Sequence, residues 1–81
     1  MKIVDVSIVT ANYNNSKFLK DFFDSIVSSS YYPKEIIFID DSSTDDSLMI
    51  VNKLQIPNIK IMALSKNVGF ANALNIGIEQ A

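Results

Sequence analysis

The sequence predicts an α/β fold, a three-layer sandwich with helices on both faces of a parallel sheet, in the order β-α-β-α-β-α. Short runs rich in β-branched residues alternate with segments whose apolar residues recur at helical spacing, and the links between them are short. Hydrophobic residues make up 48% of the 81 positions, and glycine and proline only four, as in a packed domain. This length suits one small domain or part of a larger one.

The first strand is expected at residues 4–10, where a short β-branched run resembles a strand covered on both faces. A polar stretch follows at residues 12–16. Apolar side chains at positions 18, 19, 22, 23, 26 and 27 then predict one buried face of a helix. This helix should end in the serine run at residues 28–30.

The second strand is expected at residues 35–40, and the second helix at about residues 44–54. We expect Tyr31-Tyr32-Pro33 to be a connection, because proline lacks an amide proton and restricts the residue before it. Serines and carboxylates at residues 41–46 suit a helix start.

The third strand is expected at residues 59–63, after Ile56-Pro57-Asn58 breaks the second helix. A polar turn at residues 65–67 precedes a third helix at about residues 69–80. Alternation of this kind predicts right-handed crossovers between parallel strands.

Composition excludes several kinds of chemistry. The net charge is −2 without a basic run, which argues against a nucleic-acid partner. Cysteine and histidine are absent, so disulfides, thiol catalysis, zinc-finger sites and a histidine base are excluded within this chain. The glycine-rich phosphate loops of dinucleotide-binding and P-loop proteins are also missing. No apolar run approaches the roughly 20 residues of a membrane span. We therefore expect a cytoplasmic protein, either free or bound peripherally at the inner face of the membrane.

Polar residues follow each predicted strand, where open α/β sheets bind ligands. After the first strand, Thr10 and Tyr13 offer a hydroxyl and a ring that can lie against a nucleobase. After the second, Asp40 and Asp41 can accept hydrogen bonds from a base or a ribose. The alternatives are an ordinary polar turn and a helix cap at residues 41–43.

The third loop contains Lys66, Asn67 and Gly69 and leads into a helix with Asn72 and Asn75. Its amides could face a ligand, and Gly69 would allow close backbone approach. The alternative is that the asparagines face solvent, as asparagine mostly does.

Three ordered motifs together resemble the family-2 glycosyltransferases. They are V-S-I-V-T-A-N-Y-N at residues 6–14, E-I-I-F-I-D-D-S-S-T-D at 35–45, and N-V-G-F-A-N-A-L-N-I-G-I at 67–78. The middle motif is the most specific, because this family typically carries E-I-I-V-V-D-D-x-S-x-D there. The resemblance implies a Rossmann-like, partial GT-A fold, that of the nucleotide-diphospho-sugar transferases.

The resemblance also implies a function: binding a nucleotide-sugar donor, expected to be a UDP-sugar, and transferring the sugar with inversion to a hydroxyl of a saccharide or lipid-linked acceptor. No catalytic residue or metal ligand is carried over. Eight nucleotide-binding positions are implied: Thr10, Tyr13, Asp40, Asp41, Lys66, Asn67, Gly69 and Asn75.

The sequence departs from the family pattern at three positions. Ala11 replaces a frequent proline, Ser42 stands where glycine is common, and Leu74 occupies a position often held by arginine. Without that arginine, neutralisation of the diphosphate would depend more on a metal or on Lys66.

In the family, a D-x-D metal motif and the catalytic base come after the third helix. We therefore interpret residues 1–81 as a single N-terminal segment, truncated before the D-x-D motif and inactive alone. Mg²⁺ or Mn²⁺ is expected for the full-length enzyme and not within this chain.

Two alternatives come from other classes of protein. A receiver-like signalling domain also places paired acids at a strand end, but it needs them after the first strand, where Thr10 stands. A self-associating structural fragment is the other, since an exposed sheet edge can pair with a second copy.

Overall fold

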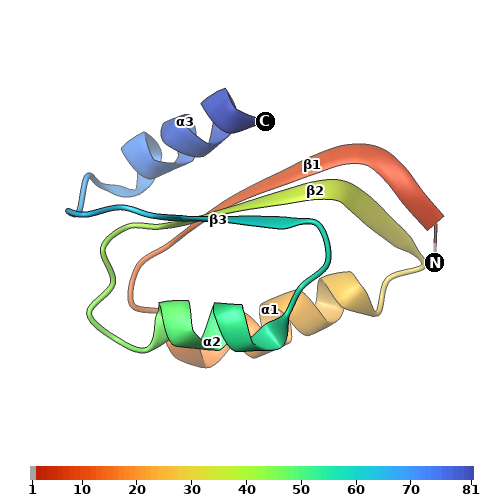
Figure 1. Cartoon of the computed structure of the whole chain (residues 1–81), viewed down its shortest axis with the longest axis horizontal. Coiled ribbons are helices and arrows are strands. Elements are labelled where there is room, and N and C mark those ends of the chain that lie inside the picture. The colour runs from red at the N-terminus through yellow and green to blue at the C-terminus, as the bar shows by residue number, and fades with distance from the viewer. Residues whose placement is uncertain (1) are drawn as a thin grey trace.

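The computed structural model describes residues 2–81 and shows three layers. Helices α1 and α2 cover one face of the sheet, and α3 lies on the other (Figure 1). The predicted order and fold class are confirmed. The elements are β1 (Lys2–Asn12), α1 (Ser16–Val27), β2 (Tyr31–Asp40), α2 (Ser47–Leu54), β3 (Ile59–Ala63) and α3 (Phe70–Gln80).

The sheet has three parallel strands in the order β1-β2-β3. Because β2 is central and both of its faces are covered, its run of four apolar residues at positions 36–39 is buried. Asn12 pairs with Asp40, and Asp40 with Ala63, so the carboxyl ends of all three strands meet at one edge.

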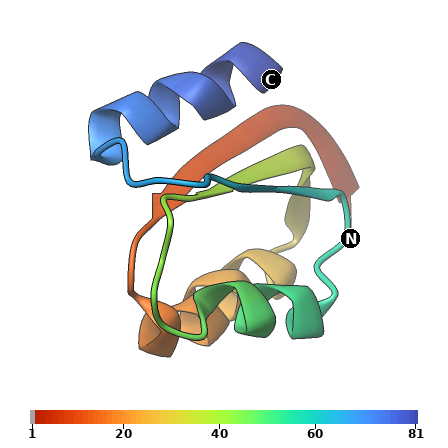
Figure 2. The ribbon, with the colours of Figure 1, turned by 60° about the vertical axis from the view of Figure 1, so that its left-hand side comes forward.

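Alternate residues of β2 enter two separate cores, since successive side chains of a strand point to opposite faces. The core on the α1 and α2 side contains Leu19, Phe23, Tyr32, Ile36, Phe38, Val51 and Ile56. The smaller core under α3 contains Ile37, Ile39 and Ala73. Figure 2 shows the two helical layers on either side of the sheet.

The prediction that residues 31–33 form a connection is wrong. They begin β2 and pair with Lys2, Ile3 and Val4 of β1. Proline is tolerated here because pairing of β2 with β3 starts only at Ile36, so the missing amide proton costs no bond to β3. Tyr32 is buried and its hydroxyl donates to the carbonyl of Pro57 at 2.6 Å.

Helix α2 begins at Ser47, three residues later than expected. The side chain of Asn14 is the reason: its Oδ1 accepts hydrogen bonds from the amides of Thr44 at 2.8 Å and Asp45 at 3.2 Å. Such side-chain bonds compete with the first helical turn. Residues 41–46 therefore form a loop held against the end of β1.

Over residues 2–81, no helix combines the length and the apolar character that crossing a bilayer requires.

Candidate functional site

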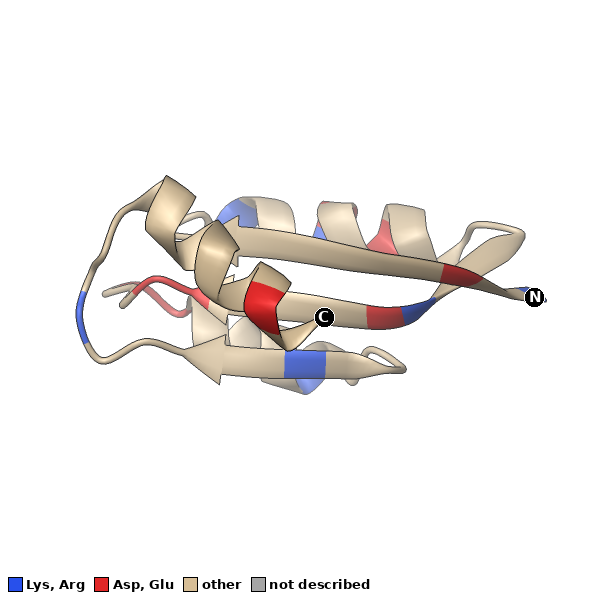
Figure 3. Cartoon of the chain, turned by 90° about the horizontal axis from the view of Figure 1, so that it is seen from above, with Lys and Arg blue, Asp and Glu red and all other residues tan. Residues whose placement is uncertain are grey.

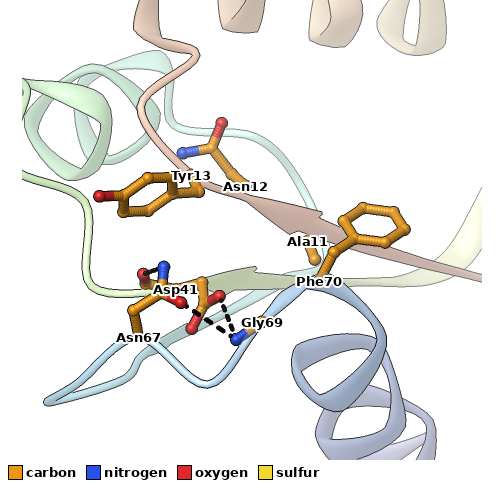
Figure 4. Close-up of a pocket in the computed structure, with 7 residues that line it drawn as sticks. All are labelled: Ala11, Asn12, Tyr13, Asp41, Asn67, Gly69 and Phe70. Carbon is orange, nitrogen blue, oxygen red and sulfur yellow. Dashed lines mark hydrogen bonds between the residues drawn. The ribbon is translucent and has the colours of Figure 1, made fainter.

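A cavity of about 320 Å³ opens at the carboxyl edge of the sheet. Its lining comes from the three segments that follow the strands, which is where open α/β sheets bind ligands. Figure 4 shows these side chains: Ala11, Asn12, Tyr13, Asp41, Asn67, Gly69 and Phe70.

Asp41 joins the second of these segments to the third. Its Oδ1 accepts the Val68 amide at 2.8 Å, and its Oδ2 accepts the Gly69 amide at 3.0 Å. The amide of the Asn67 side chain donates to the Asp41 carbonyl at 3.2 Å. The alternative that Asp41 caps α2 is thus not what the structure shows. A carboxylate has about four lone-pair positions, so Asp41 retains acceptor capacity toward the cavity.

Gly69 has a backbone conformation that other residues rarely adopt, with φ 92° and ψ 154°. An added Cβ would meet no atom within 4 Å, so the requirement for glycine comes from the backbone alone. This conformation lets the amide of Gly69 bond to Asp41 while its carbonyl accepts the Ala73 amide of α3 at 2.9 Å.

Asp40 is buried, with 1% of its surface exposed, and does not line the cavity. Its Oδ1 accepts from the side-chain amide of Asn12 at 2.9 Å and from the hydroxyl of Ser43 at 2.7 Å. Its Oδ2 accepts the Ser43 amide at 2.9 Å. Asp40 therefore holds Asn12, a lining residue, and orders the loop after β2.

Asp45 connects the starts of two helices. Its carboxylate accepts the Ser47 amide at 3.0 Å and the Ser16 amide at 3.1 Å. Desolvation is the largest single influence and would raise the pKa of Asp45, but the hydrogen bonds from Ser47 and Ser16 together outweigh it and lower that pKa below 3.8. The ionised form thus anchors the loop beside the cavity. The acidic stretch after β2 lies at the cavity end of the sheet (Figure 3).

Four of the eight residues expected at the site are brought together: Tyr13, Asp41, Asn67 and Gly69 all line the cavity. Lys66 and Asn75 are exposed and do not line the cavity. Asp40 is buried and does not line it either. Their roles in binding remain predictions.

Thr10 lies on the opposite face of β1 from Ala11. It lines a second cavity, of about 360 Å³, between β1 and α1, together with the rings of Phe18, Phe22 and Phe38. Ala11 and Asn12 line both cavities. Because side chains alternate along a strand and Ala11 packs against the core under α3, Ala11 and not Thr10 points to the α3 side. Thr10 and Tyr13 are therefore not paired in one cavity.

Three lining residues were missing from the expected set: Ala11, Asn12 and Phe70. Ala11 and Asn12 sit between Thr10 and Tyr13, so strand alternation would have identified Ala11. Phe70 stood in the third motif, but its 67% exposure at the first turn of α3 could be known only from the structure.

The described residues do not fit a metal centre. Across positions 2–81, no three histidine, cysteine, aspartate or glutamate side chains converge. The paired carboxylates of Asp40 and Asp41 are instead engaged by N–H and O–H donors.

The family model for glycosyl transferase family 2 matches residues 7–81. The chain is 38% identical over 81 residues to the poly-β-1,6-N-acetyl-D-glucosamine synthase of Staphylococcus epidermidis, a match covering 99% of this chain and 20% of that protein. The synthase of Staphylococcus aureus (strain COL) is 38% identical over 77 residues, covering 94% of this chain and 19% of that protein. The chain thus spans about a fifth of the length of these relatives.

Two solved structures share the fold. The crystal structure of S. aureus TarS 1-349 superposes with a TM-score of 0.82 and 31% identity, covering all of this chain and 24% of that one. The mannosyltransferase PcManGT of Pyrobaculum calidifontis, in complex with GDP-Man and Mn²⁺, gives a TM-score of 0.81 at 22% identity, over 99% of this chain and 24% of that one. The expected GT-A architecture is confirmed, and the receiver-like alternative finds no support, since no acid ends β1. The chain belongs to glycosyl transferase family 2.

Proposed function

We propose that this chain forms the donor-binding part of an inverting glycosyltransferase and that it holds the nucleotide of a UDP-sugar. The observation that carries the proposal is the cavity at the carboxyl edge of the sheet, where the Tyr13 ring and the Asp41 carboxylate face the same space (Figure 4). The similar proteins include a polysaccharide synthase and a mannosyltransferase in complex with GDP-Man, which supports a nucleotide-sugar donor.

The lining chemistry suits a nucleobase. Tyr13 is 46% exposed, so its ring is available to a base that stacks on it. The carboxylate of Asp41 can accept the ring N–H of uracil, which lies between two carbonyl groups. Guanine also offers a ring N–H, whereas cytosine offers only its exocyclic amine. A cavity of about 320 Å³ lies at the small end of the usual range for ligand pockets, which favours a pyrimidine.

Sugar transfer itself needs groups outside this site. Among the described side chains that line the cavity, Asp41 is the only candidate for a base, and its carboxylate already accepts two hydrogen bonds. The described residues also contain no set of metal ligands. We therefore assign residues 2–81 to donor binding and propose that a divalent metal and a general base act from elsewhere in the complete enzyme. A saccharide acceptor and action at the cytoplasmic side of the membrane belong to the same proposal.

The test is a two-dimensional NMR titration of the chain with UDP, GDP and CDP in the presence of Mg²⁺. UDP should selectively shift the amides around Tyr13, Asp41 and Gly69. The variant Tyr13→Ala should weaken this binding, and Tyr31→Ala is the matched control, because Tyr31 is 60% exposed and lies in the amino-terminal part of β2. Absence of shifts with all three nucleotides would reject the proposal for this chain.

A second candidate role is self-association through the free edge of β1. This strand has 11 residues and, within residues 2–81, pairs only with β2, and its apolar Ile3 and Val6 are about half exposed. Unpaired strand edges can template pairing with another copy. Sedimentation at millimolar concentration should then show dimers that Val6→Lys abolishes, whereas a strict monomer would contradict this role.

A further inference from the structure

Tyr13 lies between two asparagines that are both fastened to the segment after β2. On its amino-terminal side, Asn12 ends β1, and the Asn12 carbonyl accepts the Asp41 amide at 2.8 Å. On its carboxyl-terminal side, the amide of Asn14 donates to Ser43 Oγ at 3.0 Å. The backbone is therefore held on both sides of the ring that lines the cavity.

The side chain of Asn14 provides most of the attachment on the carboxyl-terminal side. Its Oδ1 accepts the amides of Thr44 at 2.8 Å and Asp45 at 3.2 Å, and its Nδ2 donates to Thr44 Oγ1 at 3.2 Å. Asn14 has φ 52°, a left-handed conformation that asparagine tolerates better than most residues with a side chain. One side chain thus fastens the turn after Tyr13 to a loop about 30 positions further along the chain.

Tyr13 has little packing of its own to hold it. Its ring is 46% exposed, and within residues 2–81 it belongs to neither hydrophobic core. Segments with few buried apolar contacts open locally at low cost. The order of this residue must therefore come from the hydrogen bonds of its two neighbours.

We infer that Asn14 is a positioning residue of the donor site, whose side chain fixes the backbone after Tyr13 and so presents the ring to the nucleobase. This inference rests on the proposed function. A ring that is ordered before binding loses less conformational freedom when a base stacks on it, which lowers the cost of binding. Asn14 itself does not line the cavity, so it acts through Tyr13.

Asn58 provides a matched control. It is also an exposed asparagine with a left-handed backbone, φ 61°, but it directly precedes β3 at the amino-terminal edge of the sheet, away from the cavity. Because glycine adopts this conformation without strain, Asn14→Gly and Asn58→Gly each remove a side chain without imposing backbone strain. Asn14→Asp is the rescue variant, since a carboxylate oxygen can accept the same two amides.

The experiment measures the Kd of UDP and of uridine by NMR titration, and the order parameter of the Tyr13 backbone amide without ligand, at a temperature where every variant is folded. We expect Asn14→Gly to raise the Kd of both ligands on the order of fivefold and to lower the order parameter from about 0.85 toward 0.6. Asn58→Gly should change neither quantity. Asn14→Asp should restore the order parameter and bring the Kd of uridine, which carries no charge, to within about twofold of the wild type.

The outcomes separate this inference from the function on which it rests. If the wild type binds UDP and Asn14→Gly binds it equally well, the positioning role is rejected and the donor site stands. If Asn14→Gly weakens binding while the order parameter of Tyr13 is unchanged, the residue acts by another route and the positioning role is again rejected. Equal weakening by Asn58→Gly would reject it as well. A wild type that binds neither ligand would reject the donor site and the positioning role together.

Discussion

The Oδ2 atom of Asp41 and the backbone amide of Gly69 lie 3.0 Å apart, a hydrogen bond between residues 28 positions apart in the sequence. Together with the bond from the Val68 amide to Oδ1, it fastens the loop before α3 to the end of β2. The geometry of the cavity depends on this link, because residues on both sides of it line the opening.

Replacing Asp41 with asparagine should loosen that link. The new amide group has one acceptor oxygen where the carboxylate has two, so one N–H of the Val68–Gly69 pair loses its partner. We expect a loss of about 1–3 kcal/mol in the free energy of unfolding, measured by urea denaturation. Asp46→Asn is the control, since Asp46 makes no side-chain cap bond, and it should change stability by less than about 0.5 kcal/mol. Equal effects of the two variants would contradict the assignment.

Gly69→Ala tests the backbone requirement at the cavity. Because φ is 92° and no atom lies within 4 Å of the added Cβ, the expected loss of about 1–3 kcal/mol comes from backbone strain and not from a clash. Gln55→Gly is the reciprocal change: Gln55 caps α2 with φ 50° and ψ 53°, so glycine there should stabilise by about 0.5–1 kcal/mol. Thermal and urea unfolding of both variants check the signs, and a stabilising Gly69→Ala would refute the argument.

The pH dependence of stability should include a contribution from Asp45. Its pKa in the folded chain lies below 3.8, so the ionised carboxylate stabilises the fold above that pH, and this stabilisation disappears as the pH falls through the lower folded value. The free energy of unfolding of Asp45→Asn should therefore decline less steeply below about pH 4 than that of the wild type. Ser47→Ala, which removes one hydroxyl bond to Asp45, should give an intermediate slope. Identical acid slopes for all three proteins would count against this account.

Tyr32→Phe tests the unexpected start of β2. The change removes the hydroxyl that donates to the Pro57 carbonyl at 2.6 Å from a fully buried residue, and we expect a loss of about 1 kcal/mol. The adjacent Tyr31→Phe removes the same group from an exposed ring and should be neutral. Denaturant midpoints would measure both, and a neutral Tyr32→Phe would mean that the hydroxyl bond contributes nothing net.

Gly77→Ala should destabilise α3 although alanine favours helices. The new Cβ would lie 2.7 Å from Cγ1 of Val9 and would clash with Cδ1 of the buried Ile39. Overpacking costs about 1–3 kcal/mol of stability, which outweighs the gain of about 1 kcal/mol from helix propensity. We therefore expect the free energy of unfolding to fall by an amount on the order of 1 kcal/mol. Glu79→Ala on the exposed part of α3 should stay within about 0.5 kcal/mol. A more stable Gly77→Ala protein would show that the sheet adjusts freely beneath the helix.

The sequence by itself determined the order of the elements and the edge of the sheet where the site lies. Hydrophobic periodicity and the break at Pro57 are local signals, and they located all six elements. The rule that ligands bind beyond the carboxyl ends of the strands, together with the three motifs, located four of the seven lining residues. The boundaries were less accurate, because the loop before α2 is held by Asn14, about 30 residues earlier.

Only the tertiary structure decided which neighbours face the cavity. Strand pairing made residues 31–33 part of β2. Alternation along β1 placed Ala11 at the cavity and Thr10 on the opposite face. Asp40 and Asp41 are adjacent, but their different hydrogen-bond partners gave them different roles. These outcomes depend on register and on hydrogen bonds between residues about 30 positions apart, which no local pattern of residue types encodes.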